Sequence, residues 1–205
     1  MIDFAYISIP KTASQSIRQL LIDNGRIDLA RKNHESIYNY GEVGFSFSFV
    51  REPIERLKSW FYFSKKKMLD SYHPTNLQTF SSLSMYNCSF NDWVKNNFPI
   101  HWGKEMCLSL GITNPLIQSD FVCKNGIIDI DYLGNFNNLR NEMIEISKKM
   151  NFTNCNLKSI GSNQKPQENL DNETVSIIKQ KFYNDFKLYE ALLQNKHLTK
   201  GTKIF

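Results

Sequence analysis

Long hydrophobic runs are missing from this sequence. A membrane-spanning helix needs about 20 consecutive apolar residues, and no apolar stretch of the 205-residue chain approaches that length. A basic and apolar leader is missing as well, because a strand-like segment that contains Asp3 begins at the second residue. We therefore expect a cytoplasmic protein, provided that the sequence has not been trimmed.

Cysteine and surplus charge are also scarce. The four cysteines, at positions 88, 107, 123 and 155, are widely spaced and form no C-x-x-C pair. We therefore predict reduced structural thiols, with neither a zinc site nor a disulfide framework. The net charge of +5 is a mild sign of an anionic ligand. It is too small to predict a nucleic-acid partner, which usually requires a denser basic patch.

The length and the pattern of elements favour a single α/β domain over residues 1–205. A chain of this length forms one large domain or at most two small ones, and no repeat or low-complexity linker divides it. Residues 70–115 predict only short helices and loops. The alternation of strands and helices elsewhere predicts a central parallel sheet flanked by helices. The predicted elements are strands at 2–9, 45–50 and 127–133, and helices at 14–24, from Pro53 onward, at 139–150 and at 175–193, the last with Asp171 or Asn172 as N-cap.

The first predicted strand leads into a loop without glycine, Pro10 to Ser16 (PKTASQS). A nucleoside-triphosphate loop reads G-x-x-x-x-G-K-[ST], so the ordinary ATP or GTP loop is not matched. The loop nevertheless enters a helix, whose N-terminal N–H groups and dipole attract anions. Lys11 and the hydroxyls of Thr12, Ser14 and Ser16 would complete an anion site, such as one for a phosphate. Taken alone, the loop is equally well interpreted as a Pro-Lys turn with a serine cap.

A second basic segment, Arg51 to Ser59 (REPIERLKS), follows the next predicted strand. The planar guanidinium of Arg51 suits two phosphate oxygens. Arg56 is explained as well by surface pairing with Glu52 and Glu55 as by a ligand. Ligands in open α/β sheets bind beyond the carboxyl ends of the strands. Two anion sites at neighbouring strand ends therefore suit one ligand with two separated phosphates.

Together the two segments resemble the motifs of the sulfotransferases that use 3′-phosphoadenosine 5′-phosphosulfate (PAPS). In that family a P-K-T-x-x-[ST] loop holds the 5′-phosphosulfate, and an R-[DE]-P-x-x-R-x-x-S segment holds the 3′-phosphate. The chain matches both in the same order, with Glu52 where aspartate is usual. The carbohydrate branch, in particular the heparan sulfate 2-O-sulfotransferase type, is the most similar. The segments 132–139 (YLGNFNNL) and 182–186 (FYNDF) also resemble this family, whereas the resemblance is thin between 65 and 125.

The resemblance implies a P-loop-like sulfotransferase architecture with PAPS as donor and no metal. It implies that Lys11 stabilises the leaving phosphate and that His34 is the general base, because the family carries its proposed base between the two motifs. A polar loop at 157–166 is comparable to one that folds over the nucleotide, so Lys158, Ser159 or Lys165 is expected to contact the donor unless this loop is an ordinary surface linker. The other donor-binding residues implied are Pro10, Lys11, Thr12, Ala13, Ser14, Gln15, Ser16, Arg51 and Ser59.

Some of these roles have alternatives. Glu35 is the alternative base, and His34 without its context would be a surface or capping residue. His73, His101 and His197 have no supporting context. The acceptor implied is a hydroxyl of a glycan, polysaccharide or glycolipid, and a lipid-linked acceptor would bring the protein to a membrane surface.

Other features are compatible with more than one function. Lysines 65–67 would guide an acidic polysaccharide or form a solvated helix end. A nucleotide-dependent small-molecule kinase and a non-catalytic nucleotide- or glycan-binding module are the alternative functions, and the oligomeric state is not predicted. The aromatic side chains that would stack on sugar rings, or more often pack in a core, are Trp60, Phe61, Tyr62, Trp93 and Trp102.

Overall fold

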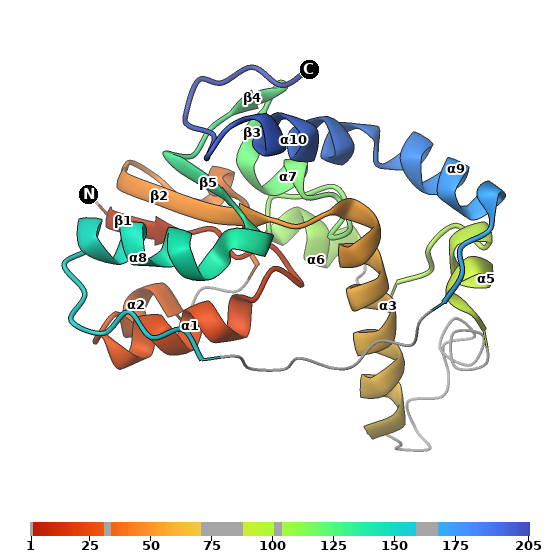
Figure 1. Ribbon diagram of the computed structural model, residues 1–205, viewed down its shortest axis with the longest axis horizontal. Coiled ribbons are helices and arrows are strands. Elements are labelled where there is room, and N and C mark those ends of the chain that lie inside the picture. Colours follow the sequence, from red (N-terminus) through yellow and green to blue (C-terminus); the bar gives the residue numbers. More distant parts are fainter. Residues whose placement is uncertain (1, 31–33, 71–87, 101–103, 159–167) are drawn as a thin grey trace.

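Three parallel strands form the centre of the structure (Figure 1). The computed structural model describes residues 2–30, 34–70, 88–100, 104–158 and 168–205. Both strand pairs of the sheet are parallel, so the predicted α/β class with a central parallel sheet is confirmed. The strands, in their order across the sheet, are β1 (Ile2–Tyr6), β2 (Val43–Val50) and β5 (Tyr132–Asn135).

Helices cover both faces of this sheet and its carboxyl end. In Figure 1, α1 and α8 lie on one face, α7 and α10 lie on the other, and α3 stands where β2 ends. The described helices are α1 (Ser14–Asp23), α2 (Ile27–Ala30), α3 (Pro53–Asp70), α5 (Phe90–Lys95), α6 (Lys104–Ser109), α7 (Ser119–Val122), α8 (Leu139–Lys149), α9 (Asn172–Lys181) and α10 (Tyr183–Gln194), with 3-10 turns η1 (Ile37–Asn39) and η3 (Phe136–Asn138). A small antiparallel pair, β3 (Cys123–Lys124) and β4 (Ile127–Ile128), lies beside them.

The alternation of phenylalanine and serine along β2 divides the core into two layers. Phe47 and Phe49 pack with Ile17 of α1 and Met143 of α8 on one face, because successive side chains of a strand point to opposite sides. Ser46 and Ser48 on the other face are also buried, and their hydroxyls form hydrogen bonds. For example, Ser48 Oγ donates to the carbonyl of Ile7 at 2.6 Å.

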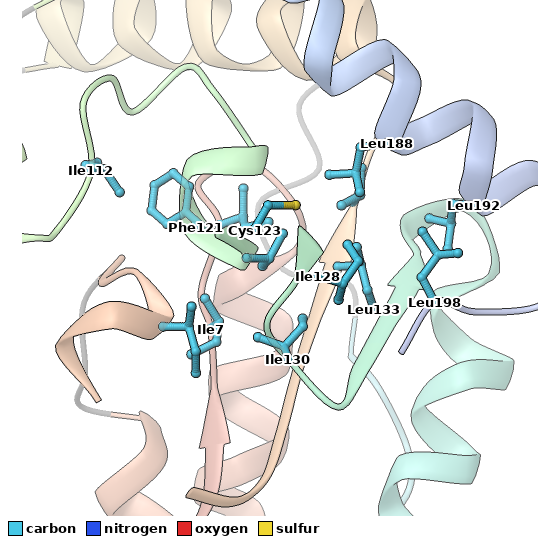
Figure 2. Packing of buried hydrophobic residues seen from close by; sticks show 14 of the residues in the cluster. Ile7, Ile112, Phe121, Cys123, Ile128, Ile130, Leu133, Leu188, Leu192 and Leu198 are labelled. Carbon is cyan, nitrogen blue, oxygen red and sulfur yellow. The ribbon is translucent and has the colours of Figure 1, made fainter. Parts of the chain in front are cut away.

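The second layer joins the sheet to α7, α10 and the C-terminal segment. Figure 2 shows Leu133 of β5 beside Leu192 of α10 and Leu198, while Ile7, just after β1, lies across the same cluster near Ile130. Leu198 exchanges two backbone hydrogen bonds with Leu133, at 2.8 and 3.0 Å, so the C-terminal segment covers the outer edge of β5. An uncovered strand edge would be open to pairing with another chain.

A third cluster joins α3, α5 and α9 at one end of the molecule. Trp60 and Phe61 of α3 pack with Trp93 of α5, and each is at most 4% exposed. These three rings are therefore core residues and not a sugar-stacking surface. Tyr62 is half-buried and its hydroxyl donates to Glu168, while Trp102 lies outside the described residues.

Three predicted elements differ from the structure. The single strand expected at 127–133 is wrong: β4 ends at Ile128 and β5 begins at Tyr132, because Asp131 between them leaves the strand path and accepts hydrogen bonds from Ser46. The first strand ends at Tyr6 and not at residue 9. The long C-terminal helix is divided at Phe182 into α9 and α10, although Asp171 caps α9 as predicted, accepting from Thr174 N at 2.7 Å.

Gly134 in β5 is held closely by the side chain that caps this strand. Glu142 of α8 is 1% exposed, and both its carboxylate oxygens accept from the backbone N–H of Asn135 at 3.0 Å. A Cβ atom on Gly134 would lie 1.8 Å from Glu142 Oε2 and 2.7 Å from the Phe49 ring. Only glycine therefore fits at this position without moving the cap.

We predict that Gly134→Ala lowers the free energy of unfolding by about 2 kcal/mol, the usual effect of overpacking a well-packed site. Urea unfolding would measure it. Gly41→Ala is the matched control, because a Cβ there meets no atom within 4 Å, and it should change stability by no more than about 0.5 kcal/mol. Equal stability of the two variants would show that Glu142 is not fixed as described.

Candidate functional site

The loop between β1 and α1 has an unusual backbone for residues with side chains. Lys11 and Ala13 have φ of 69° and 62°, in the left-handed region that favours glycine. Thr12 between them is fully buried, and its hydroxyl donates to the carbonyl of Ile9 at 2.8 Å. The Thr12 hydroxyl therefore stabilises the loop through a buried hydrogen bond, and only the backbone of Thr12 would contact a ligand.

Helix α1 begins at this loop without a side-chain cap. Ala13 occupies the N-cap position, and within the described residues no side chain accepts a hydrogen bond there. The first N–H groups of a helix have no partner inside the helix, and the helix dipole is positive at this end. Ser14 is half-buried and Gln15 exposed. The start of α1 is therefore suited to an anion.

Arg51 lies beside this loop, at the end of the neighbouring strand β2. Its Nη1 donates to the carbonyl oxygen of Lys11 at 3.4 Å, and its guanidinium carbon lies 4.6 Å from the centre of the Phe136 ring. Glu55 Oε2 is 3.8 Å from Nη2. Burial lowers the pKa of Arg51, and Glu55 opposes this shift. The two predicted anion-binding segments thus meet at one edge of the sheet.

The side chain of Lys11 reaches toward α3. Its Nζ lies 3.6 Å from the centre of the Phe63 ring. Ser59 is four residues before Phe63, so both side chains lie on the same face of the helix. Ser59 is half-buried. The structure therefore brings Lys11 and Arg51 together and places Ser59 on the helix face that Lys11 approaches.

Arg56 has a different role from either one predicted. It is 1% exposed, and its guanidinium donates to three backbone carbonyls. Nε bonds Pro10 at 2.9 Å, while Nη1 and Nη2 bond Leu116 and Pro115, each at 2.7 Å. Burial lowers its pKa to about 10, so it stays charged at neutral pH. The predicted surface pairing with Glu52 and Glu55 is wrong, because Arg56 joins the loop, α3 and the 115–116 segment inside the protein.

Two residues that sequence reasoning missed hold Arg51 in place. The side-chain amide of Gln118 accepts from Arg51 N at 3.0 Å and donates to Arg51 O at 2.8 Å, as a neighbouring strand would. Asp185 of α10 accepts from the backbone N–H groups of Gln118 and Ser119 at 2.8 and 2.9 Å. Burial raises the pKa of Asp185, and the charge of Arg56 opposes this. The only sequence signal was the family-like segment 182–186.

His34 is held beside the end of β1 by the backbone of Ser8. Its Nδ1 lies 2.7 Å from the Ser8 carbonyl oxygen. A carbonyl only accepts, so Nδ1 carries the hydrogen and the neutral ring keeps a lone pair at Nε2. Burial lowers the pKa of His34 to about 4, assisted by the charges of Arg18, Arg56 and Lys11 and opposed by the Ser8 bond. The imidazole is therefore neutral at neutral pH and can accept a proton at Nε2.

A family model described as "Sulfotransferase family" matches residues 2–190. This match includes the loop at Pro10, His34, Arg51 and the first half of α10. The chain belongs to the sulfotransferase family. Its class of chemistry is therefore sulfuryl transfer. No curated protein and no solved structure gave a significant match.

Other residues that were predicted to belong to the site either lie away from it or fall outside the residues that the structure describes. Ser159 and Lys165 lie outside the described residues, as do His73 and His101. Lys158 pairs with Asp23 at 3.0 Å, at the end of α1 opposite the loop, so the structure does not place it where it was expected.

Lys65 and His197 also contact other parts of the protein. Lys65 donates to the carbonyl of Cys88 at 3.0 Å, and the side chain of Lys67 is not described. The ring of His197 stacks on Tyr132, with ring centres 4.5 Å apart. Among the described residues, no three His, Cys, Asp or Glu side chains gather closely enough to hold a metal ion, and no helix could cross a membrane.

We predict that Arg56→Ala lowers the free energy of unfolding by about 3–5 kcal/mol, because it leaves three buried carbonyls and Asp185 without their cation. Chemical denaturation would measure the change. Arg140→Ala on the exposed side of α8 removes the same charge at the surface and should alter stability by at most about 0.5 kcal/mol. A mild effect of Arg56→Ala would contradict the role assigned to the guanidinium.

Proposed function

We propose that this sulfotransferase transfers a sulfuryl group from PAPS to a hydroxyl of a carbohydrate acceptor. The observation that carries the proposal is the contact between Arg51 Nη1 and Lys11 O at 3.4 Å. It joins two cationic segments at the carboxyl ends of adjacent parallel strands, where ligands of open α/β sheets bind. The family match and the two motifs support the same reaction.

The residues at this edge fit a donor that is anionic at both ends of its adenosine. The start of α1 and Lys11 suit the 5′ end, and Arg51 with Ser59 suits the 3′-phosphate. When bound, PAPS supplies an activated sulfuryl group on a phosphate leaving group. Lys11 and the N–H groups of the loop would stabilise negative charge that develops on that phosphate. The full loop proposed to contact the donor is Pro10, Lys11, Thr12, Ala13, Ser14, Gln15 and Ser16.

We assign His34 as the general base. Its Nε2 would accept the proton of the acceptor hydroxyl, while the Ser8 carbonyl holds the opposite nitrogen. A base with a pKa of about 4 is weak, but an anion bound at the loop would raise this pKa by offsetting the nearby cations. His34 is preferred to Glu35 because the bond to Ser8 fixes its tautomer.

The carbohydrate acceptor rests on the resemblance to the heparan sulfate branch and on the chemistry of hydroxyl acceptors. We propose precursors of a surface polysaccharide or a glycolipid, modified in the cytoplasm. A lipid-linked acceptor would bring the enzyme to a membrane surface as a peripheral protein. No nucleic-acid partner is proposed, since the net charge of +5 is modest.

Adenosine 3′,5′-bisphosphate, the desulfated donor, should stabilise the protein against heat. At 100 times its dissociation constant it adds about 2.7 kcal/mol, which is about 5 to 10 °C for a chain of this size. Arg51→Ala should weaken its binding about 10- to 100-fold, because hydrogen bonds between charged groups are lost. Titration calorimetry would measure both proteins.

Arg26→Ala is the control for this experiment, since Arg26 pairs with Asp28 after the far end of α1. Tighter binding of Mg-ATP than of the bisphosphate would instead support a kinase. Tight binding of the bisphosphate without transfer from labelled PAPS to any glycan in a library would support a non-catalytic module.

We predict that His34→Ala lowers kcat for sulfuryl transfer by about 10²- to 10⁴-fold, the usual contribution of a general base. Donor affinity should stay near that of the wild type, because His34 is not assigned to the nucleotide. Steady-state kinetics with labelled PAPS would test this. His197→Ala is the histidine control, and near-normal turnover of His34→Ala together with an inactive Glu35→Gln would transfer the role to Glu35.

A further inference from the structure

Ser8 connects His34 to an arginine that neither motif contains. Arg18 of α1 donates from Nη2 to Ser8 Oγ at 3.2 Å, and the same hydroxyl oxygen lies 3.3 Å from His34 Nδ1. Ser8 is 2% exposed, so these bonds form away from bulk water. Both the hydroxyl and the carbonyl of Ser8 thus face the same ring nitrogen of His34.

The chemistry of the three groups fixes the direction of each hydrogen bond. A guanidinium has donors only, so Ser8 Oγ accepts from Arg18. Because the Ser8 carbonyl also only accepts, Nδ1 of His34 carries the hydrogen and shares it between the two Ser8 oxygens. Arg18 therefore holds the hydroxyl in an orientation that supports the Nδ1–H tautomer, in which the lone pair is on Nε2.

Burial is the main cause of the low pKa of His34, and three cations from different parts of the chain add to it. They are Arg18 of α1, Arg56 of α3 and Lys11 of the loop. Arg56 is occupied by three backbone carbonyls, and Lys11 lies over the Phe63 ring. Arg18 is the cation that shares a hydrogen-bond partner with His34.

Two tyrosines and one carboxylate lie in the same charged surroundings. Burial raises the pKa of Tyr6 and of Tyr40, and the charge of Arg18 opposes this shift in both. Glu35 acts on Tyr40 in the opposite direction. The charged groups that act on the imidazole are therefore cationic, while Glu35 acts on Tyr40.

We propose that Arg18 is a positioning residue for the base, which orients His34 through the Ser8 hydroxyl. The catalytic role of this contact rests on the proposed function, but the link between Arg18 and His34 can be measured without any transfer reaction. No part of either nucleotide-binding motif is involved.

The direct test is NMR of the imidazole nitrogens over a pH titration, with the His34 signals identified by their loss in His34→Gln. The wild type should show the Nδ1–H tautomer at neutral pH and titrate near pH 4. Arg18→Gln should raise the pKa of His34 part of the way toward its ordinary value, because one of the nearby positive charges is removed while burial, the larger cause, is unchanged. Arg18→Lys should stay near the wild type, and the control Arg26→Gln should change nothing.

Kinetics add a readout that a purely structural role would not move. Arg18→Gln should lower kcat about 10- to 100-fold, as misoriented catalytic groups do, with little change in the KM for PAPS and an acidic limb of kcat shifted to higher pH. Arg18→Lys should recover most of kcat. Ser8→Ala keeps the carbonyl and the charge of Arg18, so it should lower kcat while shifting the pKa of His34 less than Arg18→Gln does.

Three results would overturn the proposal: an Nε2–H tautomer of His34 in the wild type, an unchanged His34 pKa in Arg18→Gln, or full kcat in Ser8→Ala. Should Arg18→Gln fail to fold, the wild-type tautomer and the Ser8→Ala kinetics still decide. A wild type that binds the bisphosphate but transfers no sulfuryl group would count against the proposed function, whereas the titration would still confirm or refute the link between Arg18 and His34.

Discussion

The buried guanidinium of Arg56 is the constraint on which the site depends. A cation removed from water must direct its N–H groups at acceptors, and Arg56 directs them at Pro10, Pro115 and Leu116. The loop at Pro10 and the 115–116 segment, both distant from Arg56 in the sequence, are thereby fixed to the first turn of α3. The loop before α1 has one position relative to the end of β2 as a result. The hydrogen bond from Arg51 to the Lys11 carbonyl is a consequence of that position.

Like charges lie close together at the site. Burial lowers the pKa of Arg56, and the charge of Arg51 adds to this effect. Glu55 and Glu52 oppose the lowering of the Arg51 pKa by burial, and Asp185 accepts hydrogen bonds from the start of α7. Cations that face one another lower the stability of the empty protein, and this arrangement is typical of functional sites. The amide of Gln118 contributes rigidity without charge, since it pairs with the backbone of Arg51. An anion bound at this edge of the sheet would reduce the electrostatic repulsion between these cationic side chains.

Local patterns predicted the sheet and the two motifs because the relevant residues are close in sequence. The alternation at Phe45, Phe47 and Phe49 and the helical spacing of Ile17 and Leu20 are such patterns, and both elements formed as expected. The tertiary partners were not predictable in this way. Gln118 meets Arg51 across 67 residues, and no periodicity encodes such a contact. The prediction of a single strand at 127–133 was wrong for a similar reason. Asp131 accepts hydrogen bonds from Ser46, which is 85 residues away, and this contact is not visible in the apolar pattern around Asp131. Surface pairing was a reasonable prediction for Arg56 because glutamates flank it in the sequence. Its actual partners are backbone carbonyls, which every residue has, so the sequence does not indicate which of them Arg56 contacts.

In the proposed function, an anion bound at the loop also changes the strength of the base. Burial lowers the pKa of His34, and the charges of Arg18, Arg56 and Lys11 add to this effect. The ring is therefore neutral, which is necessary for a base, but it is also a weak base. Negative charge bound at the loop would offset part of this field, and the proton affinity of Nε2 would rise. His34 would then become a stronger base only when the sulfuryl donor is in place. In the proposed mechanism, donor binding is thus linked electrostatically to proton removal from the acceptor, and the link requires no conformational change of the protein.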